Sequence, residues 1–316
     1  MRVLPTFCAA ASIIAASVLP MSHRNEFPDT VGTLIDWSAA ALQRGGVFCG
    51  HGTADYRDEA ASLIYHVIGL SQDDDHAYKR PVSAGQFERV EALLRRRIDA
   101  RIPLPYLLQE AWFGGLRFFI DERALIPRSP FAELIEANFA PWIGAGHVSR
   151  ILELGTGSGC IAIACALAFP DSRVVATDIS PDALAVARVN VRRYELEQRL
   201  ELLQADLFSG VEGQFDLIVS NPPYVPQDQV ASLPAEYQHE PALALASGPD
   251  GLESARLILQ DAGRYLTEGG ILALEVGAGW PALEAAFPHL PFRWPELESG
   301  GEGIALIDSA DLRHLE

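Results

Sequence analysis

Apolar residues recur every three to four positions over three stretches in the first third of the chain, which is the spacing of helices with one buried face. The stretches begin near Leu34, Ala60 and Ser83. Ser83 can cap the third helix, because a serine hydroxyl accepts hydrogen bonds from backbone N–H groups of the first turn. The pattern predicts a small helical domain over residues 21–102.

The pattern changes after this domain. Pro103 and Pro105 end the last helix, and the aromatic segment 112–120 then carries a pair of glycines that suits a tight turn. We therefore expect a β-hairpin within a linker over residues 103–128.

Short apolar runs typical of buried strands alternate with longer helical segments over residues 129–316. The predicted strands are residues 150–154, 173–177, 200–203, 215–220, 270–276 and 303–307. The predicted helices are residues 160–169, 181–194 and 253–266. This alternation predicts an α/β fold with a doubly wound, mostly parallel, Rossmann-like sheet, whose ligands bind at the carboxyl ends of its strands.

Charge and cysteine content limit the partners and cofactors. The 316 residues carry 42 acidic and 24 basic side chains, a net charge of −18. This acidity suits a basic protein partner and argues against direct binding to DNA. The cysteines form no Cys-x-x-Cys pair and have no histidine cluster nearby, so neither a disulfide framework nor a metal site is predicted. They are Cys8, Cys49, Cys160 and Cys165.

A glycine-rich motif follows the predicted strand 150–154 and opens a helix. It comprises Glu153, Leu154, Gly155, Thr156, Gly157, Ser158 and Gly159. Glycines there let the backbone turn sharply and approach a ligand, although a purely structural turn would use them too. The dinucleotide fingerprint of dehydrogenases would place its last glycine where this chain has Cys160. The spacing therefore favours a nucleoside without pyrophosphate.

Two acidic residues follow the next two predicted strands, Asp178 directly and Asp206 three positions after its strand. Asp178 is placed to accept both hydroxyl protons of a ribose. Asp206 is placed to accept from an adenine amino group, with Leu207 and Phe208 beside the ring. Acids at such positions also cap helices, so Asp206 alone decides little. Together with the glycine motif, they predict a pocket for an adenine nucleoside.

The motif Asn221-Pro222-Pro223-Tyr224 ends the predicted strand 215–220. A planar amide nitrogen is a poor nucleophile because its lone pair is delocalised, and its two hydrogens must be held while a methyl group approaches. The side-chain oxygen of Asn221 can accept one hydrogen and the carbonyl of Pro222 the other. Pro223 stiffens the turn and Tyr224 offers an aromatic wall. The motif predicts methyl transfer to a planar nitrogen, with S-adenosylmethionine as the cofactor.

These motifs together resemble those of the protein glutamine methyltransferases of the HemK family, which have the class I methyltransferase fold and use S-adenosylmethionine. The resemblance covers nearly everything after Met21. It implies cofactor contacts from Gly155 through Gly159, at Asp178, near Leu207 and at Asn221. It also implies that the target amide lies on the Asn-Pro-Pro-Tyr motif.

Further stretches are similar to the branch of that family that acts on large-subunit ribosomal protein three. They lie at residues 50–53, 102–106, 111–113, 125–130, 133–135 and 239–241. The release-factor branch carries Pro-Asp-Thr-Glu after its Ile-Pro-Arg, whereas this chain has Ser129-Pro130-Phe131-Ala132 there. The resemblance therefore implies methylation of a glutamine side chain in that ribosomal protein, with the helical domain recognising the substrate.

Three alternatives remain open. The first is methylation of peptide-chain release factors. The second is a DNA adenine methyltransferase, which uses a similar Asn-Pro-Pro-Tyr motif but needs a basic face and base flipping, against which the net charge of −18 counts. The third is a non-catalytic assembly factor, which the intact glycine motif and all four residues of the second motif disfavour.

Residues 1–20 conflict with this interpretation. The run 3–20 is uncharged and mostly apolar, preceded only by Arg2, but Pro5 and several hydroxyl side chains make it a poor membrane span. Three interpretations of this run remain. It is a disordered extension, a leader, or the product of a translation start placed too early; Met21, the only other methionine, would then be the true start. Because the methyl donor is kept inside cells, we expect a cytoplasmic protein that does not enter a membrane.

Overall fold

The computed structural model describes residues 28–71, 74, 76–143, 148–298 and 300–313. The interpretations of residues 1–20 therefore lie outside the described residues. The chain divides into two compact units. The first takes the chain up to Val47 and Tyr56–Asp99, and the second takes Phe48–Asp55 and everything from Ala100 onward.

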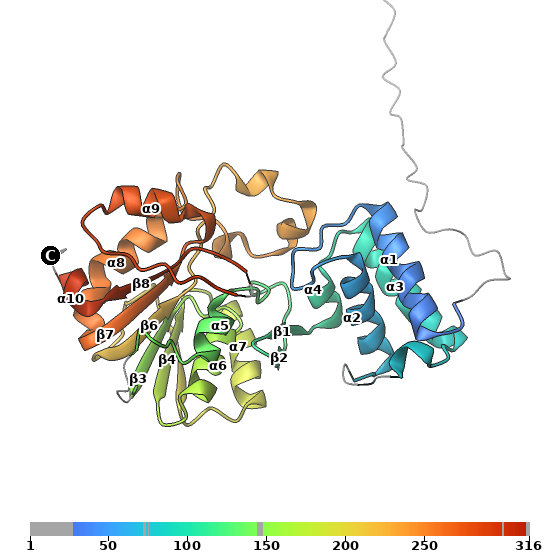
Figure 1. Ribbon diagram of the computed structural model, residues 1–316, viewed down its shortest axis with the longest axis horizontal. Helices are drawn as coiled ribbons and strands as arrows, with labels where there is room; N and C mark the ends of the chain where they lie inside the picture. Colours follow the sequence, from blue (N-terminus) through green and yellow to red (C-terminus); the bar gives the residue numbers. More distant parts are fainter. Residues whose placement is uncertain (1–27, 72–73, 75, 144–147, 299, 314–316) are drawn as a thin grey trace, which may run out of the picture. The chain divides into compact units, whose positions relative to one another are not determined.

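The first unit is helical. Its elements are α1 (Val31–Gly45), α2 (Tyr56–Ile68), the 3-10 helix η1 (Ala77–Lys79) and α3 (Ala84–Asp99) (Figure 1). Ser83 precedes α3, and its hydroxyl accepts a hydrogen bond from the Gln86 backbone N–H at 3.3 Å, so the predicted cap is confirmed. Inside this unit the buried guanidinium of Arg97 donates to Glu59 at 2.5 Å.

The second unit begins with a short helix and a hairpin. α4 (Leu104–Leu108) is followed by β1 (Ala111–Phe113) and β2 (Leu116–Phe118), which pair antiparallel as predicted. The segment after the hairpin is tied to the rest of the unit by Asn190, whose side chain accepts from the Phe119 N–H at 2.7 Å and donates to the Phe119 carbonyl at 2.9 Å.

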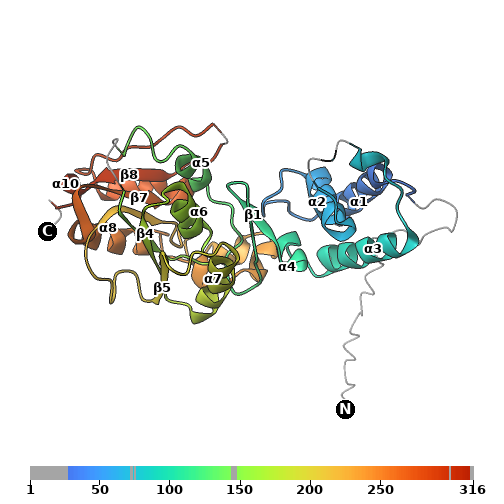
Figure 2. The same cartoon turned by 90° about the horizontal axis from the view of Figure 1, so that it is seen from below.

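A six-stranded sheet in the order β5-β4-β3-β6-β7-β8 forms the centre of this unit. All neighbours pair in parallel except β7 and β8, and Figure 2 shows β5 and β8 at opposite edges. The strands are β3 (Arg150–Leu154), β4 (Arg173–Asp178), β5 (Leu200–Gln204), β6 (Phe215–Ser220), β7 (Leu266–Glu275) and β8 (Ile304–Asp308). The predicted doubly wound, mostly parallel α/β fold is confirmed.

Helices cover both faces of the sheet (Figure 1). α5 (Phe131–Glu136), α6 (Cys160–Ala168) and α7 (Pro181–Arg193) pack into one apolar core, and α8 (Glu253–Tyr265), α9 (Trp280–Ala286) and α10 (Ser309–Leu312) pack into the other. The short 3-10 helices are η2 (Val230–Ser232), η3 (Ala235–His239), η4 (Ala242–Ala244) and η5 (Gly277–Gly279). Strand β7 begins before the predicted residue 270 because α8 runs directly into it. In the described part of the chain, every helix is too short or too polar to cross a membrane.

Candidate active site

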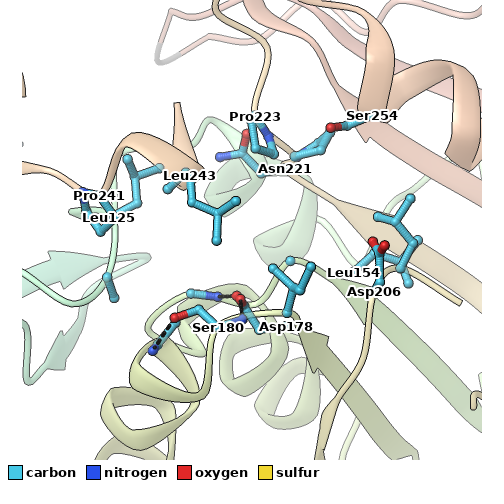
Figure 3. A pocket seen from close by; sticks show the side chains of 18 of the residues that line it. Leu125, Leu154, Asp178, Ser180, Asp206, Asn221, Pro223, Pro241, Leu243 and Ser254 are labelled. Atoms are coloured by element: carbon cyan, nitrogen blue, oxygen red, sulfur yellow. Dashed lines mark hydrogen bonds between the residues drawn. The ribbon is translucent and has the colours of Figure 1, made fainter. Parts of the chain in front are cut away.

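A pocket opens at the carboxyl ends of β3, β4, β5 and β6, where the fold predicts a ligand site. Most of the predicted site residues meet there. Those that line the pocket are Gly155, Gly157, Asp178, Asp206, Leu207, Asn221, Pro222 and Pro223. Figure 3 shows Asn221 and Pro223 on one side of the space, with Asp178 and Ser180 on the other.

Five predicted residues lie close to the pocket without lining it. They are Glu153, Thr156, Ser158, Gly159 and Tyr224. Glu153 lies beneath the glycine loop, where it accepts a hydrogen bond from the Thr156 hydroxyl and one of 3.0 Å from the Ala162 N–H. Burial raises the pKa of Glu153 to about 8. Its position makes it a support of the loop.

The glycine loop needs backbone conformations that other residues rarely adopt. Gly157 has φ +55° and Gly159 has φ +82°. Gly159 also caps α6 and lies so close to α7 that an added Cβ would be 3.3 Å from the Cβ of Ala187. Thr156 fixes the loop against the next strand, because its N–H donates to the Thr177 carbonyl at 2.8 Å. The loop is thereby held open toward the pocket.

Both oxygens of the Asp178 carboxylate accept backbone hydrogen bonds. The Gly157 N–H donates to Oδ2 at 2.8 Å, and the Ser180 N–H donates to Oδ1 at 2.9 Å. Burial raises the pKa of Asp178, and these two hydrogen bonds oppose the shift. Each carboxylate oxygen has a second lone pair, so Asp178 can still accept hydroxyl protons from a ribose in the pocket.

The segment after β5 brings a strained residue to the pocket. Leu207 has φ +48°, which is unusual for a residue with a side chain and costs about 1 to 3 kcal/mol. The Ser209 N–H donates to the Asp206 carbonyl at 2.9 Å and closes this turn. The turn places both Asp206 and Leu207 on the lining, where the adenine interpretation requires them.

The Asn-Pro-Pro-Tyr motif leaves β6 at the pocket edge. Ser220, the last residue of β6, donates its hydroxyl to the Leu154 carbonyl at 2.8 Å and joins the two central strands. Beyond the motif, the Val225 N–H donates to the Leu245 carbonyl at 2.8 Å, and Val225 accepts from the Ser247 N–H at 2.9 Å. The motif is thus fixed at both ends, and the side chain of Asn221 is left at the pocket.

Several lining residues were not predicted from the sequence. Ile179, Leu243 and Leu257 are large apolar side chains that are 48%, 59% and 46% exposed, and all three line the pocket. Figure 3 shows Leu243 reaching into the space between Asn221 and Asp178. Glu253 adds a third carboxylate to those of Asp178 and Asp206. The sequence held no signal for Leu243, Leu257 or Glu253, because they come from elements far along the chain.

An ion pair between the partly exposed Arg128 and the buried Glu240 anchors the wall that carries Leu243. Arg128 donates to both oxygens of Glu240, at 2.5 and 2.7 Å, and the Ile126 N–H donates to Glu240 at 3.2 Å. The Arg128 guanidinium also lies 5.2 Å from the centre of the Tyr237 ring. His51 reaches the same group, with its Nε2 atom 3.8 Å from Glu240. Three of the stretches that carried the resemblance therefore meet at one anchor beside the pocket.

Comparison with known proteins gives the family of the chain. Residues 138–239 match the methyltransferase small domain. A ribosomal protein uL3 glutamine methyltransferase of Francisella tularensis is 42% identical over 90% of this chain and 91% of its own length. One of Neisseria meningitidis is 45% identical over 88% of this chain and 92% of its own length. The chain belongs to the family of ribosomal protein uL3 glutamine methyltransferases.

Membership in the ribosomal protein uL3 glutamine methyltransferase family makes the chain a methyltransferase and confirms the resemblance found in its motifs. Its members match this chain across both units, not across the second unit alone. Among solved structures, the catalytic domain of hMettl16 in complex with the MAT2A 3'UTR hairpin 1 is 17% identical, over 78% of this chain and 88% of its own length, with a TM-score of 0.48.

Proposed function

We propose that the protein transfers a methyl group from S-adenosylmethionine to the side-chain amide nitrogen of one glutamine in large-subunit ribosomal protein three, uL3. The observation that carries the proposal is the full-length match to relatives of that name, at 42 to 45% identity. Asn221 and Pro222 at the edge of the pocket supply the chemistry that a planar amide requires.

The pocket suits the cofactor by charge. S-adenosylmethionine carries a sulfonium and an ammonium group against one carboxylate, so its net charge is positive. Asp178, Asp206 and Glu253 line the pocket and favour such a ligand. In this proposal Asp178 holds the ribose hydroxyls, Asp206 accepts from the adenine amino group, and Leu207 packs beside the ring.

The chain's own residues would activate and hold the target nitrogen. When bound, the cofactor supplies an electrophilic methyl group. The Asn221 side-chain oxygen and the Pro222 carbonyl each accept one amide hydrogen, which fixes the lone pair in one direction and leaves electron density on nitrogen. The product proton can leave to water, so the proposal needs neither a metal ion nor a strong base.

The alternative substrates are less well supported. Methylation of release factors would use the same pocket and motif, but the full-length relatives carry the ribosomal protein in their names. Methylation of DNA adenine would require close approach to phosphates, and the net charge of −18 opposes it. Free ribosomal protein is basic because it binds RNA, and an acidic enzyme attracts it over about 8 Å at physiological salt.

The three predicted segments of the chain would then divide the work. We propose that the helical domain, residues 21–102, recognises the substrate, that the linker 103–128 joins it, and that residues 129–316 bind cofactor and catalyse transfer. Because S-adenosylmethionine and unassembled ribosomal protein are both found in the cytoplasm, we place the enzyme there.

Mass spectrometry of uL3 from cells with and without this gene tests the proposal. We expect uL3 from the deficient cells to lack one methyl group, while their release factors stay modified. Restoring the gene with an Asn221→Ala substitution should leave uL3 unmethylated. Release factors that lose a methyl group while uL3 keeps its own would reassign the enzyme to the release-factor branch.

A further inference from the structure

Tyr224 follows the lining residues Asn221, Pro222 and Pro223, and its hydroxyl reaches a buried carboxylate. Its hydroxyl donates to Glu275 Oε1 at 3.3 Å, and the residue does not join its three motif neighbours among the described residues that line the pocket. The tyrosine is therefore held by a group that belongs to another strand, at the end of β7.

Glu275 is 3% exposed and uses both of its oxygens. While Oε1 accepts from Tyr224, Oε2 accepts from the hydroxyl of Ser129, which is itself 8% exposed. The Ser129 oxygen in turn accepts from the Phe131 N–H at 3.1 Å, which fixes the direction of its hydroxyl. A hydrogen-bonded chain therefore runs from Ser129 through Glu275 to Tyr224.

Two glycines leave room for Tyr224. An added Cβ at Gly277, which has φ +50°, would lie 3.0 Å from Cε2 of the tyrosine ring. An added Cβ at Gly251, with φ +78°, would lie 2.4 Å from the Tyr224 carbonyl oxygen. The ring of Tyr224 thus packs closely against Gly277 and its backbone against Gly251, while the hydroxyl is held by Glu275.

Stability alone gives little reason for an acid at position 275. Taking a carboxylate out of water is costly, and the hydrogen-bond partners of Glu275 in the described part of the chain are two neutral hydroxyls. Burial raises the pKa of Glu275 to about 7, although the nearby charge of Arg128 opposes this shift. A buried acid that contacts a motif residue is a candidate for a role at the site.

We propose that Glu275 and Ser129 are positioning residues for methyl transfer: they hold the Tyr224 ring where it forms one wall for the target amide. This inference rests on the proposed function. It separates two parts of the site, because the pocket lined by Asp178 binds cofactor whereas the Ser129–Glu275–Tyr224 chain orients the substrate. Loss of these hydrogen bonds should lower kcat and leave cofactor affinity unchanged.

A double-mutant cycle tests whether Glu275 acts on methyl transfer through Tyr224. Glu275→Gln keeps the shape of the side chain, and we expect kcat for uL3 methylation to fall about tenfold, the worth of one orienting hydrogen bond. The Kd for S-adenosylmethionine and the KM for uL3 should stay within about twofold, the scatter expected of an unaffected binding step. Tyr224→Phe should reduce kcat as much, and the double variant should be no slower than Tyr224→Phe alone. Additive losses would overturn the proposal.

Two further variants cover misfolding and nonspecific damage. Ser129→Ala should give a smaller loss of kcat that also disappears in the Tyr224→Phe background, and it carries the test if Glu275→Gln fails to fold. Thr267→Val alters the opposite end of β7, where the Thr267 hydroxyl donates to Asp216 at 3.0 Å, and it should leave kcat unchanged. A loss of kcat with Ser129→Ala that persists in the Tyr224→Phe background contradicts the proposal.

Nuclear magnetic resonance separates this proposal from the choice of substrate. With ¹³Cζ-labelled tyrosine, the Tyr224 signal is the one that Tyr224→Phe removes from the eight tyrosines of the chain. Glu275→Gln and Ser129→Ala should both shift it, and Thr267→Val should not. If uL3 is not methylated by the wild-type enzyme, the proposed function fails while this readout still decides the link. If Glu275→Gln leaves the Tyr224 signal in place, the proposal that Glu275 positions Tyr224 is overturned.

Discussion

The Asp178 carboxylate accepts a 2.8 Å hydrogen bond from the backbone N–H of Gly157, so the acid assigned to the ribose also holds the glycine loop. Asp178→Ala should therefore weaken S-adenosylmethionine binding by about 1.5 to 3 kcal/mol, the worth of hydrogen bonds to a charged group. Calorimetric titration measures the change. The matched control is Asp182→Ala, an exposed acid in the first turn of α7, which should bind normally. Equal affinity of the wild-type protein and Asp178→Ala would remove Asp178 from the cofactor site.

Leu243 should contribute to cofactor binding although no motif contains it. Its side chain is 59% exposed and reaches into the pocket, so a bound cofactor would cover it. Leu243→Ala should weaken binding by about 1 kcal/mol through lost apolar burial. Leu167→Ala, at a 40% exposed leucine of α6, is the control, because Leu167 lies outside the lining. A Kd that responds equally to the two substitutions argues that Leu243 does not touch the cofactor.

The Arg128–Glu240 pair should be important for the stability of the catalytic unit. The Glu240 side chain is fully buried and accepts two hydrogen bonds from the partly exposed Arg128 guanidinium, so Glu240→Ala should cost about 1.5 to 3 kcal/mol of unfolding free energy, the worth of hydrogen bonds to a charged group. Urea unfolding followed by tryptophan fluorescence measures it. Asp36→Ala breaks an ion pair with Arg57 that is exposed on both sides, and its cost should stay below about 1 kcal/mol. If Glu240→Ala costs as little as Asp36→Ala, the Arg128–Glu240 pair is not an anchor.

Glu153 should make stability depend on pH. Its pKa is about 8 in the folded protein against an ordinary value of 4.5, so the folded state binds the extra proton between these values. The stability from the neutral form is fully present below about pH 4.5 and is lost as the pH rises to about 8. Glu153→Gln should therefore gain unfolding free energy relative to wild type between pH 5 and 8, by a few kcal/mol. Glu201→Gln, at an exposed position of β5, is the matched control for the substitution itself. A pH-independent difference between Glu153→Gln and wild type would contradict the assignment.

Strands whose signal lies within a few neighbouring residues could be predicted from the sequence most accurately. Residues 150–154 and 215–220 were predicted to the residue, because each is an apolar run between turn-forming residues and both lie at the sheet centre. The start of β7 was placed late, since Gly269 and Gly270 imitate a turn between α8 and a strand that in fact runs through them.

Site residues could be predicted where the backbone itself passes the pocket. They were predicted less well where the direction of the side chain decides whether a residue lines the pocket. Glu153 and Leu154 are adjacent, but alternation along β3 turns Leu154 into the pocket and Glu153 beneath the loop. Likewise Tyr224 follows Pro223 in the motif, yet its hydroxyl is held by Glu275. That partner lies 51 positions further along the chain, beyond the reach of a local pattern.

Asn221 and the pocket beside it are proposed to methylate a glutamine amide of uL3. Purified enzyme, labelled S-adenosylmethionine and isolated uL3 test it most directly, with tandem mass spectrometry to locate the label. We predict one methyl group on the amide nitrogen of a single glutamine. Asn221→Ala should bind cofactor yet lose turnover by about 100-fold, the scale of a misplaced reacting group, while Gln227→Ala, at an exposed position after the motif, should remain active. Label on another residue type, or near-normal turnover by Asn221→Ala, would contradict the claim.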